Sequence, residues 1–177
     1  MTEETQDDYL TWRETAQVFA PDRKFIQAQF DLLEALLPDP DEWVQLVGTA
    51  AKLEYGLRSK QGLLVYIVTS HALYARKRGL LGWGKILCLP AVDVQRYGTG
   101  LTGIYAGYAA QTTTGRFSIA VGTVEAAEAI ADALGRACDH VKLGMPLHAP
   151  GSPEARAYDS ERSQQLVSQR HGSSSAG

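Results

Sequence analysis

The chain has 177 residues, of which 45% are hydrophobic and 21% charged, and its formal net charge is −3. This length suits one domain with peripheral segments, large enough to bury a core without disulfides or metals. No apolar run approaches the ~20 residues of a membrane-spanning helix, so a transmembrane chain is excluded.

The N-terminal sequence MTEETQDDYL is acidic and lacks the basic start and apolar stretch of a secretory signal. A cytoplasmic location is therefore expected. The two cysteines, Cys88 and Cys138, are far apart and form no metal-ligand spacing. Each lies in an apolar pattern, which predicts buried thiols and agrees with a reducing compartment.

Charge is distributed unevenly along the chain. Residues 1–42 contain eleven acidic and three basic side chains, a net charge of −8, whereas residues 43–98 contain two acidic and eight basic side chains, a net charge of +6. This asymmetry indicates an electropositive surface on the middle segment. The alternative is that exposed strand edges carry Lys and Arg to prevent aggregation.

The first segment, residues 5–37, is predicted to form two helices, because its apolar residues recur at helical spacing. Pro21 ends the first helix, and the sequence Pro38-Asp39-Pro40-Asp41 ends the second. The apolar faces are formed by Tyr9, Trp12, Ala16 and Phe19 in the first helix and by Phe25, Ile26, Phe30, Leu33, Leu36 and Leu37 in the second.

From Trp43 the apolar period changes to two, which predicts strands. Residues 55–62 are interpreted as a loop with basic residues, and residues 63–69 as a strand buried on both faces. Pro90 interrupts the pattern, as it would at a sheet edge or bulge. The seven predicted strands cover residues 44–51, 63–69, 72–77, 85–89, 92–97, 104–112 and 116–121.

A single helix is predicted to follow, over residues 123–143. Thr123 suits the N-cap, and Glu125 suits the positive end of the helix dipole. Its apolar stripe consists of Ala127, Ile130, Ala131, Leu134, Cys138 and Val141. Residues 144–177 lose this periodicity and end in a Gly/Ser-rich run, which predicts a disordered tail.

Seven strands followed by one amphipathic helix resemble the pleckstrin-homology (PH) superfold. The runs Leu64–Thr69 with Ser70–Tyr74, and Ile86–Val94 with its proline break, are similar to bacterial PH-like and GRAM-like domains. The resemblance implies an α+β fold, a seven-stranded antiparallel barrel capped by a C-terminal helix. The domain would cover residues 43–143, with the helical pair in residues 1–42 before it and the tail in residues 144–177 after it. Members of this superfold bind lipids, bind peptides or support assembly, so the fold alone does not choose among them.

Basic residues around residues 60–85 form the first candidate site. Lys60 followed by Arg76, Lys77 and Arg78 resembles the phosphoinositide-binding pattern of eukaryotic PH domains, because clustered cations hold phosphate by charge-assisted hydrogen bonds. On a strand, however, Arg76 and Arg78 point to one face and Lys77 to the other. The alternative is a set of solvated strand residues.

The glycine-rich tip of the same segment is the second candidate site. Leu80, Leu81 and Trp83 lie between glycines and beside Arg78 and Lys85. Apolar groups ringed by cations suit an anionic membrane. A Trp with neighbouring Leu also suits a protein partner. In the third interpretation, Trp83 folds back over the edge of the predicted barrel or against the N-terminal helices.

No enzyme, metal or cofactor site is predicted. The four histidines, His71, His140, His148 and His171, show no ligand spacing, and no serine or carboxylate pair has a catalytic context. Tyr97, Tyr105 and Tyr108 near Arg96 are interpreted as packing residues rather than a surface that stacks nucleic-acid bases.

The sequence therefore predicts a non-enzymatic adaptor module for protein–protein interaction or self-association. The alternative is peripheral binding to anionic lipid through the Arg76–Lys85 hairpin. A further hypothesis from the charge distribution is that the acidic N-terminal helices lie near this basic hairpin and mask it.

Overall fold

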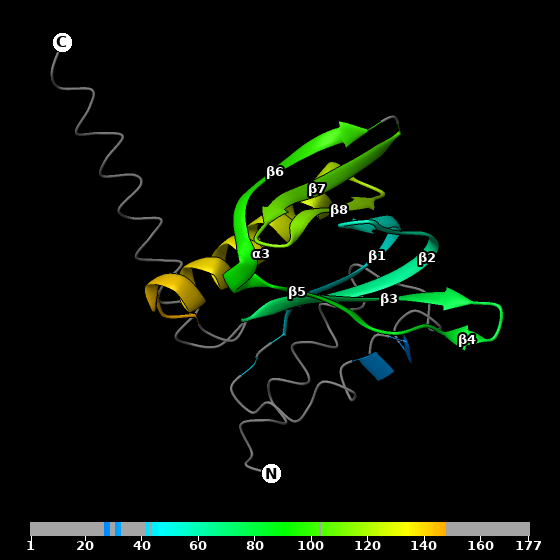
Figure 1. Ribbon diagram of the computed structural model, residues 1–177, viewed down its shortest axis with the longest axis horizontal. Helices are drawn as coiled ribbons and strands as arrows, with labels where there is room; N and C mark the ends of the chain where they lie inside the picture. The colour runs from blue at the N-terminus through cyan, green and yellow to red at the C-terminus, as the bar shows by residue number, and fades with distance from the viewer. Residues whose placement is uncertain (1–26, 29–30, 33–41, 43, 103, 148–177) are drawn as a thin grey trace, which may run out of the picture.

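The computed structural model describes residues 27–28, 31–32, 42, 44–102 and 104–147. Within these residues it contains eight strands, a short 3₁₀ helix η1 and one long helix α3 (Figure 1). Their bounds are β1 Val44–Tyr55, β2 Arg58–Thr69, β3 Ala72–Gly79, β4 Gly82–Trp83, β5 Leu87–Pro90, η1 Ala91–Asp93, β6 Val94–Thr102, β7 Tyr105–Thr112, β8 Gly115–Val121 and α3 Val124–Leu143. No helix in this described part is long and apolar enough to cross a membrane.

The strands form a continuous antiparallel sheet with the order β4-β3-β2-β1-β8-β7-β6, and β5 pairs with β3 beside this path. Strand β1 pairs with β2 along its length and with β8 only through Lys52 to Tyr55, after a register shift between Ala50 and Lys52. A bulge of this kind bends a strand. The sheet therefore turns at β1, so that the half containing β6, β7 and β8 lies over the half containing β2, β3 and β5 (Figure 1). The predicted α+β class, with an antiparallel sheet followed by a C-terminal helix, is confirmed.

Three predicted elements differ in the structure. The predicted strand over residues 92–97 begins later, because Ala91–Asp93 form η1, and it continues as β6 to Thr102. Residues 55–62 are not a loop: only Gly56 and Leu57 form a turn, Gly56 with a positive φ of 59°, and β2 begins at Arg58. The early part of β2 is solvent-exposed and polar, so it lacks the apolar alternation by which a strand is recognised. The predicted fourth strand, residues 85–89, is displaced to β5, and the two-residue strand β4 precedes it.

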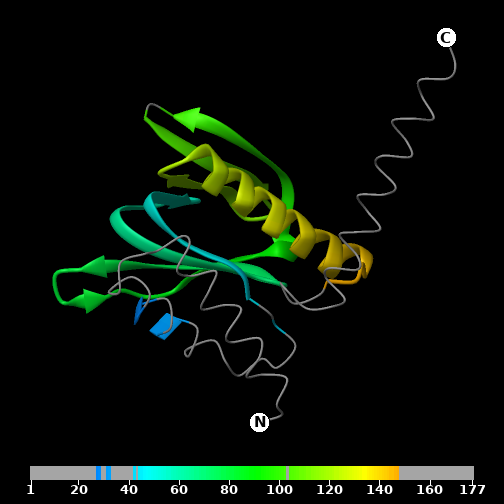
Figure 2. The ribbon, with the colours of Figure 1, turned by 180° about the vertical axis from the view of Figure 1, so that it is seen from behind.

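One core joins both halves of the sheet to α3. Its largest fully buried side chains include Tyr66 from β2, Tyr108 from β7 and Phe117 from β8. Helix α3 begins at the predicted N-cap, where the Thr123 side chain accepts a hydrogen bond from the Ala126 amide, and it ends at Gly144 with a φ of 66°. Figure 2 shows α3 crossing in front of the strands. Its buried residues are Ala127, Ile130, Ala133, Leu134, Gly135, Ala137 and Cys138.

The outer face of the β1–β2–β3 half carries a second apolar cluster, which we call the outer cluster. It consists of Ala28, Leu32, Val47, Val65 and Ile67, all of them buried. Residues 27–28 and 31–32 are helical and lie against this face. The rest of the predicted helices, and the predicted tail beyond residue 147, lie outside the described residues.

A buried glutamine ties the sheet to α3. The Gln45 side-chain amide donates hydrogen bonds to the backbone carbonyls of Thr69, at 2.7 Å, and of Ala133, at 3.1 Å. Its carbonyl oxygen accepts a hydrogen bond from Arg136 Nε at 3.2 Å. Because a buried amide is stable only when its hydrogen-bonding groups are satisfied, Gln45 fixes where β1, β2 and α3 meet.

Gly48 of β1 is required by the Tyr66 ring that lies over it. A Cβ atom at this position would lie 2.5 Å from Tyr66 Cζ, and the fully buried ring has no room to move. We therefore expect Gly48→Ala to destabilise the fold by about 3 kcal/mol, the cost of an overpacked core. The measurement is the free energy of unfolding from a denaturant titration. Gly98→Ala is the matched control, since a Cβ there meets open space. Equal stability of the two variants would contradict the close packing of the Tyr66 ring on Gly48.

Candidate functional site

The candidate site is the hairpin formed by β3 and β4, which extends away from the rest of the sheet (Figure 1). Arg78 pairs with Trp83 and Gly79 with Gly82, so Leu80 and Leu81 form a two-residue turn. Gly82 has a φ of 110°, a conformation that favours glycine. The glycines of the sequence therefore allow the chain to reverse tightly and present two leucines at its end.

Both tip leucines are fully exposed, Leu80 at 106% and Leu81 at 105% of the reference surface. Arg78 and Lys85, on either side of the turn, are exposed as well. The structure thus places the predicted apolar tip and its neighbouring cations together in solvent.

The cations occupy both faces of the sheet. Lys77 pairs with the core residue Leu64, so it lies on the core-facing side. Arg76 pairs with Val65 of the outer cluster, so it lies on the opposite side, and Arg78 follows it by strand alternation. The predicted division of these side chains between two faces is confirmed, and one face cannot gather them into a single phosphate pocket.

Two of the cations hold the segment that follows β4 in place, Arg76 from the hairpin and Lys60 from β2. Arg76 Nε donates a hydrogen bond to the Gly84 carbonyl at 3.2 Å, and the Lys60 ammonium donates one to the Lys85 carbonyl at 3.4 Å. The strand β2, which carries Lys60, thereby supports the segment between β4 and β5. These contacts hold Lys60, Arg76 and Lys85 around the base of the hairpin.

Trp83 does not share the exposure of the tip leucines. Its side chain is half-buried and packs against the outer cluster, and the Arg76 guanidinium carbon lies 5.8 Å from its ring centroid. This is the third of the interpretations that the sequence left open. The helical segment containing Ala28 and Leu32 therefore lies at the base of the hairpin, whereas masking of the hairpin by acidic residues stays a prediction.

Cys88 corrects the prediction of two buried thiols. Cys138 is buried, but Cys88 is exposed, because β5 alternates and turns Leu87 and Leu89 inward. Cys88 pairs with Tyr74 on the outer face. Although the residue as a whole is exposed, neighbouring groups partly desolvate its thiol, and this desolvation and the negative charge of Glu42 raise the pKa of the thiol. A raised pKa disfavours the thiolate, which is the reactive form of a cysteine.

The predicted packing role is confirmed for Tyr108 and, at the rim, for Tyr97, whereas Tyr105 is exposed. Tyr108 is buried in the core, and the Tyr97 ring lies beside it with centroids 5.8 Å apart. Tyr97 also approaches α3 closely, since a Cβ on Gly135 would lie 2.5 Å from the Tyr97 hydroxyl. One pair of side chains was missed by sequence reasoning: His71 and His140 lie together, although nothing in their spacing indicates it.

No protein-family model matches this chain, and no curated protein matches it at a significant level.

The different surroundings of Trp83 and of the tip leucines predict different effects on stability. Trp83→Ala removes a half-buried ring from the outer cluster and should destabilise the fold by about 2 kcal/mol. Leu80→Ser and Leu81→Ser remove fully exposed side chains and should change stability by less than about 0.5 kcal/mol. Denaturant unfolding of the three variants measures the free energy of unfolding of each. A stability loss at Leu80 as large as that at Trp83 would contradict the exposed tip.

Proposed function

We propose that the chain is a non-enzymatic binding module of the PH-like type, which docks on an anionic membrane surface through its β3–β4 hairpin. Support for the fold assignment comes from the strand order, in which β1 joins two antiparallel halves, and from α3, which packs on the core between them. Covering the open side of a bent sheet with one amphipathic helix is the arrangement that the sequence resemblance implies.

The observation that carries the functional proposal is the full exposure of Leu80 and Leu81 at the end of a projecting hairpin. Burying a leucine side chain that is otherwise in water stabilises by about 1.5–3 kcal/mol. A two-residue tip is narrow enough to enter the interface of a bilayer, where it needs no complementary surface to receive it.

The arrangement of cations favours a surface over a pocket. Lys77 and the pair Arg76 and Arg78 face opposite sides of the sheet. A hairpin inserted by its tip is surrounded by head groups, so cations on both faces can meet anionic lipids. Each Lys or Arg close to such a surface contributes about 1 kcal/mol of attraction.

The tip is less suited to binding a protein partner. Interface anchors are typically large aromatic side chains that enter a pocket of the partner. Trp83, the aromatic residue next to the tip, already packs against the outer cluster. Two leucines also offer far less area than the roughly 800 Å² that each partner buries in a standard interface.

Vesicle binding tests the proposal. The full-length chain should co-sediment with vesicles containing phosphatidylserine, and binding should weaken as salt is raised. The double variant Leu80→Ser/Leu81→Ser should bind roughly 10–100-fold more weakly, because it loses apolar insertion. The double variant Arg78→Glu/Lys85→Glu should lose at least about tenfold, mainly at low salt.

Matched controls come from the same chain. Leu143 is 70% exposed at the far end of α3, so Leu143→Ser removes an exposed leucine away from the hairpin. Arg96→Glu/Arg116→Glu reverses two exposed cations on the other half of the sheet. Both controls should bind like wild type. Equal losses in the controls would show that the hairpin is not the contact, and absence of binding at every anionic fraction would remove the membrane function.

A second candidate function, self-association, is favoured by strand β6. It ends the strand order, and within the described residues its outer edge has no pairing strand. The β6–β7 end also exposes apolar side chains, with Leu101 at 74% and Ile104 at 87% of the reference surface. An unpaired edge with apolar neighbours accepts an added strand, and a second copy of this chain can supply its own β6.

Light scattering over a range of concentrations tests this second function. If β6 pairs with β6 of another copy, Leu101→Lys should shift the dimer toward monomer, because a charge at the edge opposes strand addition. Leu57→Lys is the control, since Leu57 is exposed at a different turn. A wild-type chain that stays monomeric at all concentrations would exclude self-association through β6.

A further inference from the structure

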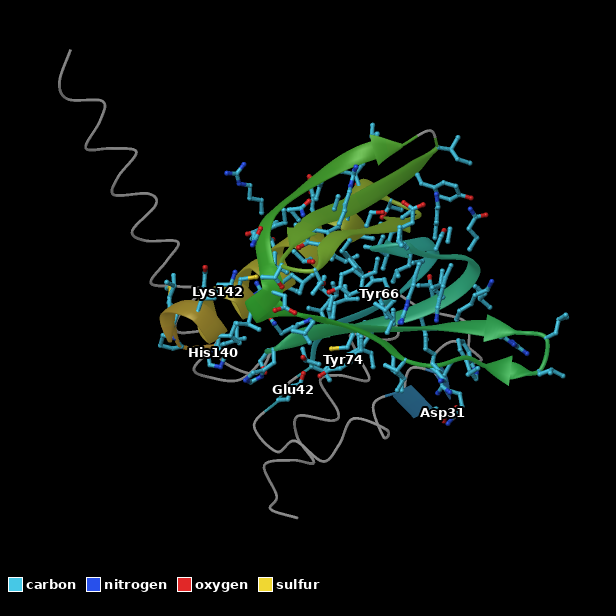
Figure 3. All side chains as sticks on the ribbon, viewed as in Figure 1. Asp31, Glu42, Tyr66, Tyr74, His140 and Lys142 are labelled. Carbon is cyan, nitrogen blue, oxygen red and sulfur yellow. The ribbon has the colours of Figure 1, made fainter. Side chains whose placement is uncertain are left out.

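Two histidines that are distant in the sequence meet at the end of α3. His71 lies in the turn between β2 and β3, and His140 lies in the last turn of α3 (His140 is labelled in Figure 3). Their ring centroids are 5.5 Å apart and the ring planes are inclined at 84°. Both side chains are partly exposed, so a solute can reach them.

Both backbone groups of His71, the amide and the carbonyl, are hydrogen-bonded. Its amide donates a hydrogen bond to Thr69 Oγ1 at 3.2 Å, and its carbonyl accepts one from the Ala91 amide at 2.8 Å. The turn is therefore tied both to β2 and to the start of η1. His140 is held equally well, because it is part of α3 and its carbonyl accepts a hydrogen bond from the Gly144 amide at 3.0 Å.

The Nδ1 atom of each imidazole ring is hydrogen-bonded. His140 Nδ1 lies 2.7 Å from the Met145 carbonyl oxygen. A carbonyl only accepts, so this nitrogen donates its proton, and the Nε2 atom of the neutral ring carries a lone pair. His71 Nδ1 lies 2.8 Å from Ser70 Oγ, a hydroxyl that is able to accept the same kind of bond. Metal-binding histidines are oriented in this way, with one ring nitrogen donating to an oxygen and the other binding the ion.

We propose that His71 and His140 form a binding site for a divalent transition-metal ion such as Zn²⁺, each through Nε2. Imidazole suits Zn²⁺, Cu²⁺ and Ni²⁺ rather than Mg²⁺ or Ca²⁺, which require oxygen ligands. With Zn–N bonds of about 2.0–2.1 Å, two imidazoles on one tetrahedral ion have centroids about 5 Å apart, close to the separation observed.

The remaining coordination positions belong to water. Among the described residues, no group of three or more His, Cys, Asp and Glu side chains is placed to hold an ion, so these two imidazoles act without a third ligand from this part of the chain. An ion bound here links the β2–β3 turn to the C-terminal end of α3. Because it binds the folded state, it stabilises the packing of α3 on the sheet in proportion to its concentration.

Zinc-dependent thermal unfolding of the full chain tests the site. ZnCl₂ should raise the melting temperature of wild type, whereas MgCl₂ at the same concentration should not. His71→Gln and His140→Gln should each weaken zinc binding by at least about 100-fold, which exceeds the roughly 10–100-fold effect of losing an outer-shell partner. His148→Gln and His171→Gln are the matched controls and should keep the full zinc response.

The zinc response is compared with and without metal for the same variant, so a loss of intrinsic stability does not imitate a loss of binding. A second measurement uses wild type alone: in NMR spectra of the imidazole nitrogens, zinc should shift the Nε2 signals of His71 and His140, assigned from the variants. An unchanged zinc response in His71→Gln or His140→Gln would overturn the proposal. A wild-type chain without any zinc response would overturn it as well.

Discussion

From Leu64 to Val68, strand β2 is apolar on both faces, and the rest of the structure depends on covering these two faces. Tyr66 faces the core, while Val65 and Ile67 face the opposite side, and all three are fully buried. A sheet that is apolar on both sides is stable in water only when both sides are covered. The bent sheet and α3 cover one face, and the helical segment around Ala28 and Leu32 covers part of the other.

This constraint explains why the β3–β4 hairpin is the exposed element. The hairpin extends past the covered part of β2, so its base can pack while its end cannot. Trp83, near the base, joins the outer cluster, and Leu80 and Leu81, at the end, are fully exposed. The proposed membrane contact therefore uses the side chains that the fold leaves uncovered, and the packed tryptophan keeps the hairpin in place.

Polar contacts decide how α3 is seated. Gln45 joins β1, β2 and α3 through three hydrogen bonds, and the Lys142 ammonium donates a hydrogen bond to the Val94 carbonyl. His140 lies in the same last turn of α3 and meets His71 of the β2–β3 turn. The end of the helix is thus held by contacts to two separate parts of the sheet, and metal binding at the histidines would add to them. Gln45 and the histidines gave no sequence signal, because their partners are backbone groups or residues far along the chain.

By itself, the sequence determined the elements that carry a strong local signal. The apolar pattern predicted the buried strand at residues 63–69 and the C-terminal helix with its Thr123 cap. The flanking glycines predicted the turn at Leu80 and Leu81. The sequence also determined that Arg76 and Lys77 face opposite sides, because strand alternation is a local property. Only the tertiary structure decided that Trp83 packs inward, that Cys88 is exposed, that residues 58–62 continue β2, and that His71 meets His140. Exposure and long-range contact depend on how the sheet bends at β1, and the periodicity of a single segment carries no information about that bend.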